Sequence, residues 1–101
     1  MATAADGLTE YERKYFTPAA QRGVRAIRAL DDVALLALAR CAAFATAKGA
    51  GDDPGAAAAY VTVVAATGPG TNPLWVTSTA AASAYERGVM EPEEMDRIVD
   101  E

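Results

Sequence analysis

The sequence contains no histidine and a single cysteine, Cys41. A histidine-ligated metal site and a Ser-His-Asp or Cys-His triad all need a histidine, and a disulfide needs two cysteines. Cysteine-based zinc and iron–sulfur sites need several thiolates from the same chain. These sites are excluded within one chain, and no catalytic motif takes their place. We therefore expect no cofactor, no metal and no enzymatic activity.

Large apolar side chains are also scarce. Alanine fills 25 of the 101 positions, whereas Leu, Ile, Val, Met, Phe and Trp together fill 22. A chain of this length forms one domain, and it buries only about 60–70% of the surface that its unfolded form exposes. We expect a single helical domain over residues 1–101. Because each alanine contact buries little area, we also expect this domain to gain further burial from a partner protein.

Charge is unevenly distributed along the chain. The net charge is −5, but residues 1–48 carry seven bases and five acids (+2), and residues 49–101 carry two bases and nine acids (−7). An acidic protein is repelled by nucleic acids and anionic membranes, so neither is an expected partner. The opposite signs predict attraction between the two halves, within one chain or between neighbouring chains.

No segment has the character of a membrane anchor. The longest apolar run, residues 33–47, has about 15 residues and contains Arg40, whereas a spanning helix needs about 20. No basic start followed by an apolar run opens the sequence, as a secretory signal would require. We expect a cytoplasmic protein, or one incorporated in a particle that is assembled in the cytoplasm.

Local signals for helix starts and stops recur along the sequence. Thr9 and Glu12 have the spacing of a capping box, and Thr17 precedes a proline that suits the first helical turn. Asp31, Asp53, Asn72 and Glu91 are further start positions, and Gly49, Gly68 and Gly88 are stop positions. These signals predict helices at about 10–16, 18–30, 32–48, 54–66, 73–87 and 92–100.

The fold class predicted from this pattern is all-α, a compact bundle of five to six short helices. The helix at 32–48 is apolar almost all round, and we expect it to be the central and most enclosed element. An α+β alternative has one hairpin at 60–65/74–79, because both segments are rich in β-branched and aromatic residues. We favour helices there because alanine blocks adjoin both segments.

Several positions are candidates for contact with a partner. Arg22, Arg25 and Arg28 follow one another at three-residue spacing, so they form a slanting stripe on one helix. They could bind an acidic surface of another protein or phosphate, or form an ordinary solvated face that pairs with the acidic C-terminal segment. Arg40 could anchor an ion pair at a subunit contact, or mark the strip of its helix that reaches water.

The last segment is the best candidate for a docking element. Met95, Ile98 and Val99 give it an apolar side between acidic flanks. This side could fill a groove on a partner protein, or fold back on the basic half of its own chain.

Two further features have plainer explanations. The loop 67–72 could hold an anion or nucleotide if it followed a strand and opened a helix, but it lacks the third glycine and the lysine of known phosphate loops. A connection between helices is the favoured interpretation. Cys41 has no histidine to act as its base, so we interpret it as a small core residue.

We therefore predict a non-catalytic helical protein that acts through protein–protein contacts in a homo- or hetero-oligomer. It would serve as an assembly, structural or accessory subunit of a larger complex, such as a phage virion component or a small enzyme subunit. One alternative is an acidic regulator or inhibitor that covers a basic site on a target protein. Another is an anion or nucleotide binder that uses the loop 67–72.

Overall fold

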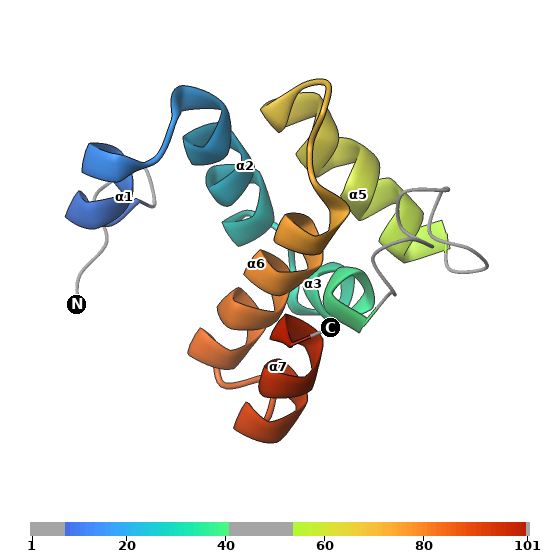
Figure 1. Ribbon diagram of the computed structural model, residues 1–101. Helices are drawn as coiled ribbons and strands as arrows, with labels where there is room; N and C mark the ends of the chain where they lie inside the picture. Colours follow the sequence, from blue (N-terminus) through green and yellow to red (C-terminus); the bar gives the residue numbers. More distant parts are fainter. Residues whose placement is uncertain (1–7, 41–53, 101) are drawn as a thin grey trace.

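The computed structural model describes residues 8–40 and 54–100, and within these ranges it contains six α-helices and no strand. The all-α prediction is confirmed, and the hairpin alternative is wrong because residues 60–65 and 74–79 both lie inside helices. Helical propensity of the adjoining alanines outweighs the β-branched residues there. The helices are α1 (Glu10–Tyr15), α2 (Pro18–Arg28), α3 (Asp32–Arg40), α5 (Pro54–Thr67), α6 (Pro73–Glu86) and α7 (Pro92–Val99) (Figure 1).

Side-chain caps open α1, α2, α3 and α6 as the sequence predicts, whereas α7 begins at Pro92 without a side-chain cap from Glu91. The Thr9 hydroxyl accepts a hydrogen bond from the Glu12 amide at 3.1 Å, and the Glu12 carboxylate accepts one from the Thr9 amide at 2.9 Å. Each bond satisfies an amide that has no partner within the helix. The same capping role belongs to Thr17, Asp31 and Asn72.

Glycines end two of the helices. Gly68 and Gly88 follow α5 and α6 with φ of 97° and 78°, a left-handed conformation that glycine adopts without steric cost. The predicted stop at Gly49 and the start at Asp53 lie outside the described residues. So do Cys41 and the second half of the predicted helix 32–48.

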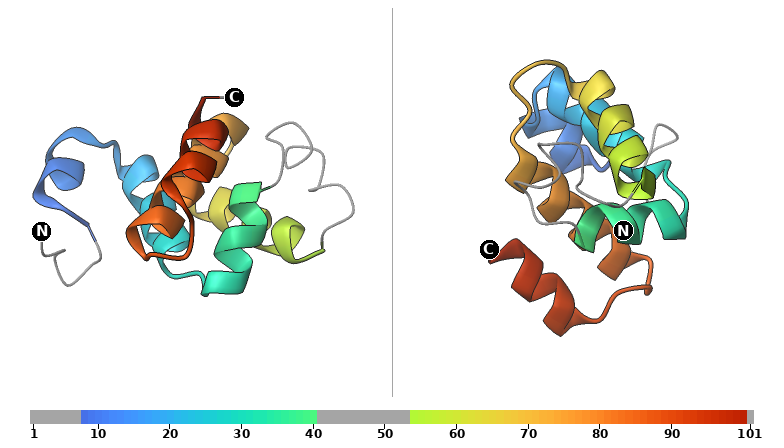
Figure 2. Two further views of the ribbon diagram at one scale, coloured as in Figure 1. Left: turned by 90° about the horizontal axis from the view of Figure 1, so that it is seen from below. Right: turned by 90° about the vertical axis from the view of Figure 1, so that its right-hand side faces the viewer.

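Helix α6 is the centre of the described structure. It packs against α2, α3 and α7, and six of its residues are buried (Figure 2). Four of these six are Ala or Ser, whose small side chains let the neighbouring helices approach closely. The helix beginning at Asp32 was predicted to be the most enclosed, but in its described part three of nine residues are buried, a smaller share than in α6, and Val33 is 80% exposed. A single apolar side chain such as Val33 can remain exposed at the surface of a folded protein.

The hydrophobic core lies where α2, α3, α5 and α6 meet. Its largest fully buried members are Ile27, Leu35, Leu38, Val63 and Val76, and alanines of α3, α5 and α6 fill the space between them. Helix α7 closes one side of this core through Met95 and Ile98.

Helix α1 stands apart from this body (Figure 1 and the left view of Figure 2). None of its six residues is buried, although Leu8, two residues before it, is. Two residues with extended backbone, Phe16 and Thr17, connect it to α2. The N-terminal segment is therefore an arm attached to the body at few points.

No helix within the described ranges combines the length and the apolar character that crossing a bilayer requires.

Candidate functional site

The arginine stripe of α2 is partly engaged in contacts within the chain. Arg28 forms a bidentate ion pair with Glu12 of α1, with Nη1–Oε1 at 2.6 Å and Nη2–Oε2 at 2.7 Å. The Nε of Arg22 donates to the Ala66 carbonyl of α5 at 2.9 Å. Arg25 is exposed on α2. The stripe thus connects α1 and α5 to α2, and a contact of these residues with a partner stays a prediction.

The pair between Glu12 and Arg28 attaches the arm to α2, together with hydrogen bonds from the Gln21 side chain to the carbonyls of Arg13 and Phe16. Hydrogen bonds from Arg28, and then from Thr9, lower the pKa of the Glu12 carboxyl below its ordinary value of 4.5, against the opposing effect of burial. The same pair raises the pKa of Arg28. Both side chains are charged at neutral pH, and both are largely shielded from water, with 23% of Arg28 and 13% of Glu12 exposed.

The C-terminal helix folds back on its own chain. Arg40 of α3 pairs with Glu94 of α7, with Nε–Oε2 at 2.8 Å and Nη2–Oε1 at 3.1 Å. These hydrogen bonds raise the pKa of Arg40 and lower that of Glu94. Met95 and Ile98 pack against the core, where α7 lies mainly against α6, whereas Val99 is 45% exposed. Contact of these three residues with a partner stays a prediction.

Arg87 joins the two halves of the chain in a way that the sequence did not suggest. Its guanidinium donates to the carbonyls of Arg28 at 2.8 Å and Leu30 at 2.7 Å, and it pairs with Asp32 at 3.1 Å. These carbonyls belong to the last turn of α2 and the residues after it, which lack helical partners. The available signal was an arginine directly after the end of a helix whose only charged residue is Glu86.

The loop 67–72 borders a cleft of about 380 Å³, but its chemistry differs from that of a phosphate site. It follows helix α5, so the strand that such a site requires is absent. The Thr71 hydroxyl donates to the Gly68 carbonyl at 2.7 Å, and Asn72 caps α6, so both polar side chains have partners. The lining is uncharged and comprises Ala19, Ala20, Thr67, Pro69, Gly70, Thr71, Asn72 and Trp75.

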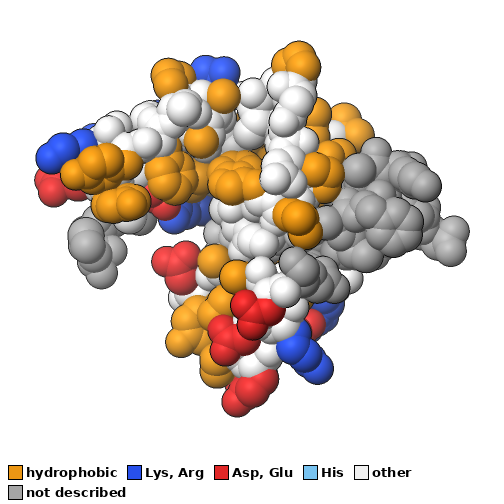
Figure 3. Space-filling model, viewed as in Figure 1, with side chains coloured by type: hydrophobic (Ala, Val, Ile, Leu, Met, Phe, Trp, Pro, Cys, Tyr) orange, Lys and Arg blue, Asp and Glu red, His pale blue; other side chains and the backbone are white. Residues whose placement is uncertain are grey.

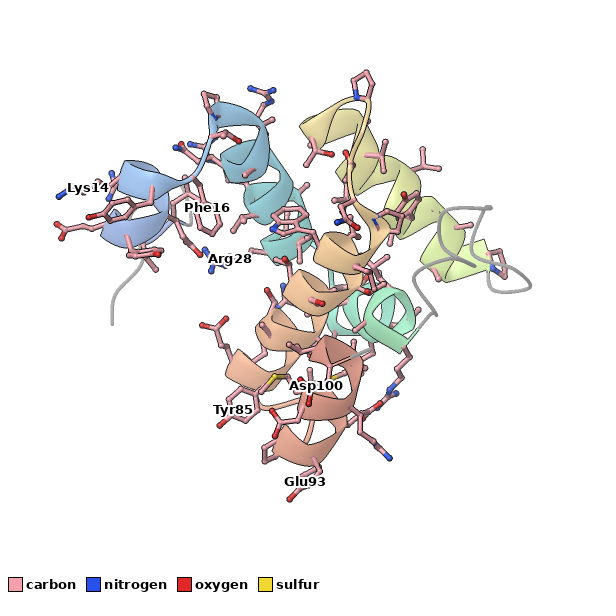
Figure 4. All side chains as sticks on the ribbon, in the orientation of Figure 1. Lys14, Phe16, Arg28, Tyr85, Glu93 and Asp100 are labelled. Carbon is pink, nitrogen blue, oxygen red and sulfur yellow. The ribbon has the colours of Figure 1, made fainter. Side chains whose placement is uncertain are left out.

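A second cleft, also of about 380 Å³, separates the arm from α6 and α7. Phe16 and Arg28 border it from the side of the arm and α2, as Figure 4 shows. Ser83, Glu86 and Val99 border it from the other side. The side of the arm that faces α6 and α7 is therefore separated from them by this cleft.

The arm carries the most exposed aromatic cluster of the described residues. Tyr11 and Tyr15 are 65% and 62% exposed, and their ring centroids lie 4.8 Å apart. Phe16 contacts Tyr11 edge-on at 6.4 Å, and the ammonium of Lys14 lies 5.4 Å from the centre of the Tyr15 ring. We call residues 9–16 the tyrosine arm.

The tyrosine arm was not among the partner-binding residues predicted from the sequence. The sequence shows that Leu8, Tyr11 and Tyr15 share one side of the first helix, as core residues do. The structure shows that Leu8 is buried and that the two tyrosines are exposed, a difference that the helical spacing alone does not reveal.

In the described part of the chain, no three acidic or cysteine side chains gather where they could hold a metal ion. Comparisons with protein-family models, with curated proteins and with solved structures find no match to this chain.

Proposed function

We propose that this protein is a non-catalytic subunit of a larger assembly and that it binds a partner protein through the tyrosine arm. The observation that carries the proposal is the exposed pair of Tyr11 and Tyr15 on a helix that projects from the body. Tyrosine is enriched at the energetic centres of protein interfaces, because its rigid ring supplies apolar area and its hydroxyl supplies a hydrogen bond.

The surroundings of the tyrosines support this role. Tyr11, Tyr15 and Phe16 contact one another, and the cation of Lys14 lies near the Tyr15 ring. The bidentate pair of Glu12 with Arg28 fixes the arm on the body, so a partner would meet side chains that are already ordered. Ordering before binding lowers the entropic cost of association.

Site-specific photo-crosslinking in the cells that produce the protein tests this proposal. A benzoyl-phenylalanine replaces Tyr11 in one variant, Tyr15 in a second and Val33, the most exposed apolar control, in a third. We expect both tyrosine positions to give a discrete crosslinked band and position 33 to give none. Bands absent from both tyrosine positions, or equal in strength at all three, would overturn the proposal.

A second candidate function is that of an acidic regulator, favoured by the exposed carboxylates of Glu93 and Asp96 on α7. Such a regulator would cover a basic site on its target with α7. Reversal of Glu93 and Asp96 tests it, whereas Glu94 is unsuitable because it pairs with Arg40. If this candidate is correct, the reversal abolishes crosslinks formed from benzoyl-phenylalanine at the exposed Val99 of α7 and leaves those formed from Tyr11 unchanged.

A further inference from the structure

We propose that the tyrosine arm binds helix α7 of a second copy of this chain, so that copies associate head to tail. This inference rests on the proposed function and names the partner of the arm. Both surfaces are present on every copy, and they carry charges of opposite sign.

The exposed charges of the arm sum to a positive value. Glu10, Arg13 and Lys14 are exposed, which gives +1. The carboxylate of Glu12 is matched by Arg28 within the same chain and adds nothing to this sum. The arm thus presents the cations of Arg13 and Lys14 on the same short helix as the exposed rings of Tyr11 and Tyr15.

The surface of α7 and its flanking residues is acidic. The exposed residues Glu91, Glu93, Asp96 and Asp100 oppose the exposed Arg97, which gives −3, and Glu94 is matched by Arg40. Two partly exposed apolar side chains accompany these charges: Val99 on α7 itself, and Tyr85 near the end of α6 (Figure 4). In Figure 3 acidic and hydrophobic side chains lie next to one another over this region.

The two surfaces are therefore complementary. Each combines apolar side chains with charged ones, and the signs are opposite, which is the arrangement that steers and orients protein association. The net charge of −5 opposes association at long range. At physiological ionic strength, however, charges more than about 8 Å apart are largely screened, so the local contacts dominate.

A contact between two different surfaces of identical chains has a structural consequence. Binding of one arm leaves the α7 of that copy available for a third copy, so association continues beyond the dimer. It ends in a closed ring if the rotation between copies closes, and in a filament if it does not.

Charge reversal with complementation tests this proposal in the full chain. The first variant combines Arg13→Glu with Lys14→Glu, so that both its arm and its α7 are acidic. The second combines Glu93→Lys with Asp96→Lys, which changes its α7 from −3 to +1, the same sign as its arm. Ala58→Glu with Ala65→Glu, at exposed positions of α5, serves as a control that adds charge outside both surfaces.

Light scattering at several concentrations and salt levels measures the mass. We expect the native chain and the α5 control to exceed 10.5 kDa at low salt and to approach it as salt rises. Each reversal variant alone should stay at monomer mass, and an equimolar mixture of the two should associate again. Circular dichroism of each variant checks that it is folded. A lower assembly mass of a folded variant then reflects lost association and not unfolding.

Two outcomes would overturn the inference: a native chain that is monomeric at low salt at every concentration, or reversal variants that do not associate when mixed. The crosslinking experiment separates this failure from that of the proposed function. Bands from Tyr11 and Tyr15 that contain a different protein retain the proposed function and overturn the second copy as partner. The absence of any band overturns both.

Discussion

At the scale of single residues, Gly23 determines how closely three helices approach. It lies buried on α2, where a Cβ atom would overlap the Cγ2 methyl of Thr67 on α5. The same Cβ would lie 3.0 and 3.1 Å from two ring atoms of Trp75 on α6. A side chain at position 23 would therefore push α2 away from both of its neighbours.

Replacement of Gly23 by alanine tests this close contact. Although alanine favours a helix, we expect Gly23→Ala to lower the free energy of unfolding by about 1–3 kcal/mol, because overpacking displaces its neighbours. Adding Thr67→Ser removes the opposing methyl and keeps the hydroxyl, and it should restore part of the loss. Urea unfolding of both variants and of Thr67→Ser alone measures the difference. Equal losses with and without Thr67→Ser would contradict the explanation.

At the scale of helices, α1 depends on the pair of Glu12 with Arg28. We expect Glu12→Gln to lower the free energy of unfolding by about 1–2 kcal/mol at pH 7, since it removes a charge-assisted hydrogen bond and keeps a side chain that can cap the helix. The exposed Glu10→Gln is the matched control, and its effect should be within about 0.5 kcal/mol. Thermal unfolding followed by circular dichroism measures both.

The same pair predicts how stability changes with pH. The pKa of Glu12 is lower in the folded chain than its ordinary value of 4.5, so its contribution is fully present above pH 4.5. That contribution is lost as the pH falls from 4.5 through the folded pKa. The stability difference between the native chain and Glu12→Gln should therefore shrink in acid. A difference that stays constant down to pH 3 would contradict the assignment.

The helices themselves were predictable because their signals are local. Each cap joins residues two or three positions apart, as Asn72 and Leu74 or Thr9 and Glu12 show. The contacts between helices join distant residues: Arg28 pairs with a residue 16 positions away, and Arg40 with one 54 positions away. Charge asymmetry predicted attraction between the halves, but it could not identify which acid meets which base.

The position of the candidate surface was unpredictable for a related reason. A periodic apolar side indicates that one face of a helix is suited to burial. It does not indicate whether that face packs against the same chain or against another protein. Met95 and Ile98 are covered by their own chain, and Tyr11 and Tyr15 are not, although all four fit the same helical spacing. The difference lies in packing, and faces made largely of alanine resemble one another too closely to specify it.

At the scale of the whole molecule, stability depends on a few large side chains. Domains of this size have unfolding free energies of about 5–15 kcal/mol. Leu38 is fully buried in the core, and we expect Leu38→Ala to lower the free energy of unfolding by about 2–5 kcal/mol. Val33→Ala on the same helix, at an 80% exposed position, should change it by less than about 0.5 kcal/mol. Comparable losses in chemical denaturation would show that α3 is packed differently.

The carboxylate of Glu12 has a consequence for the motion of the molecule. It accepts hydrogen bonds from the Thr9 amide and from both terminal nitrogens of Arg28, so one group starts the helix and also attaches it. A helix of six residues does not persist alone in water. The helicity of α1 therefore depends on its attachment to α2, and loss of the pair between Glu12 and Arg28 should weaken the helix as well as its attachment.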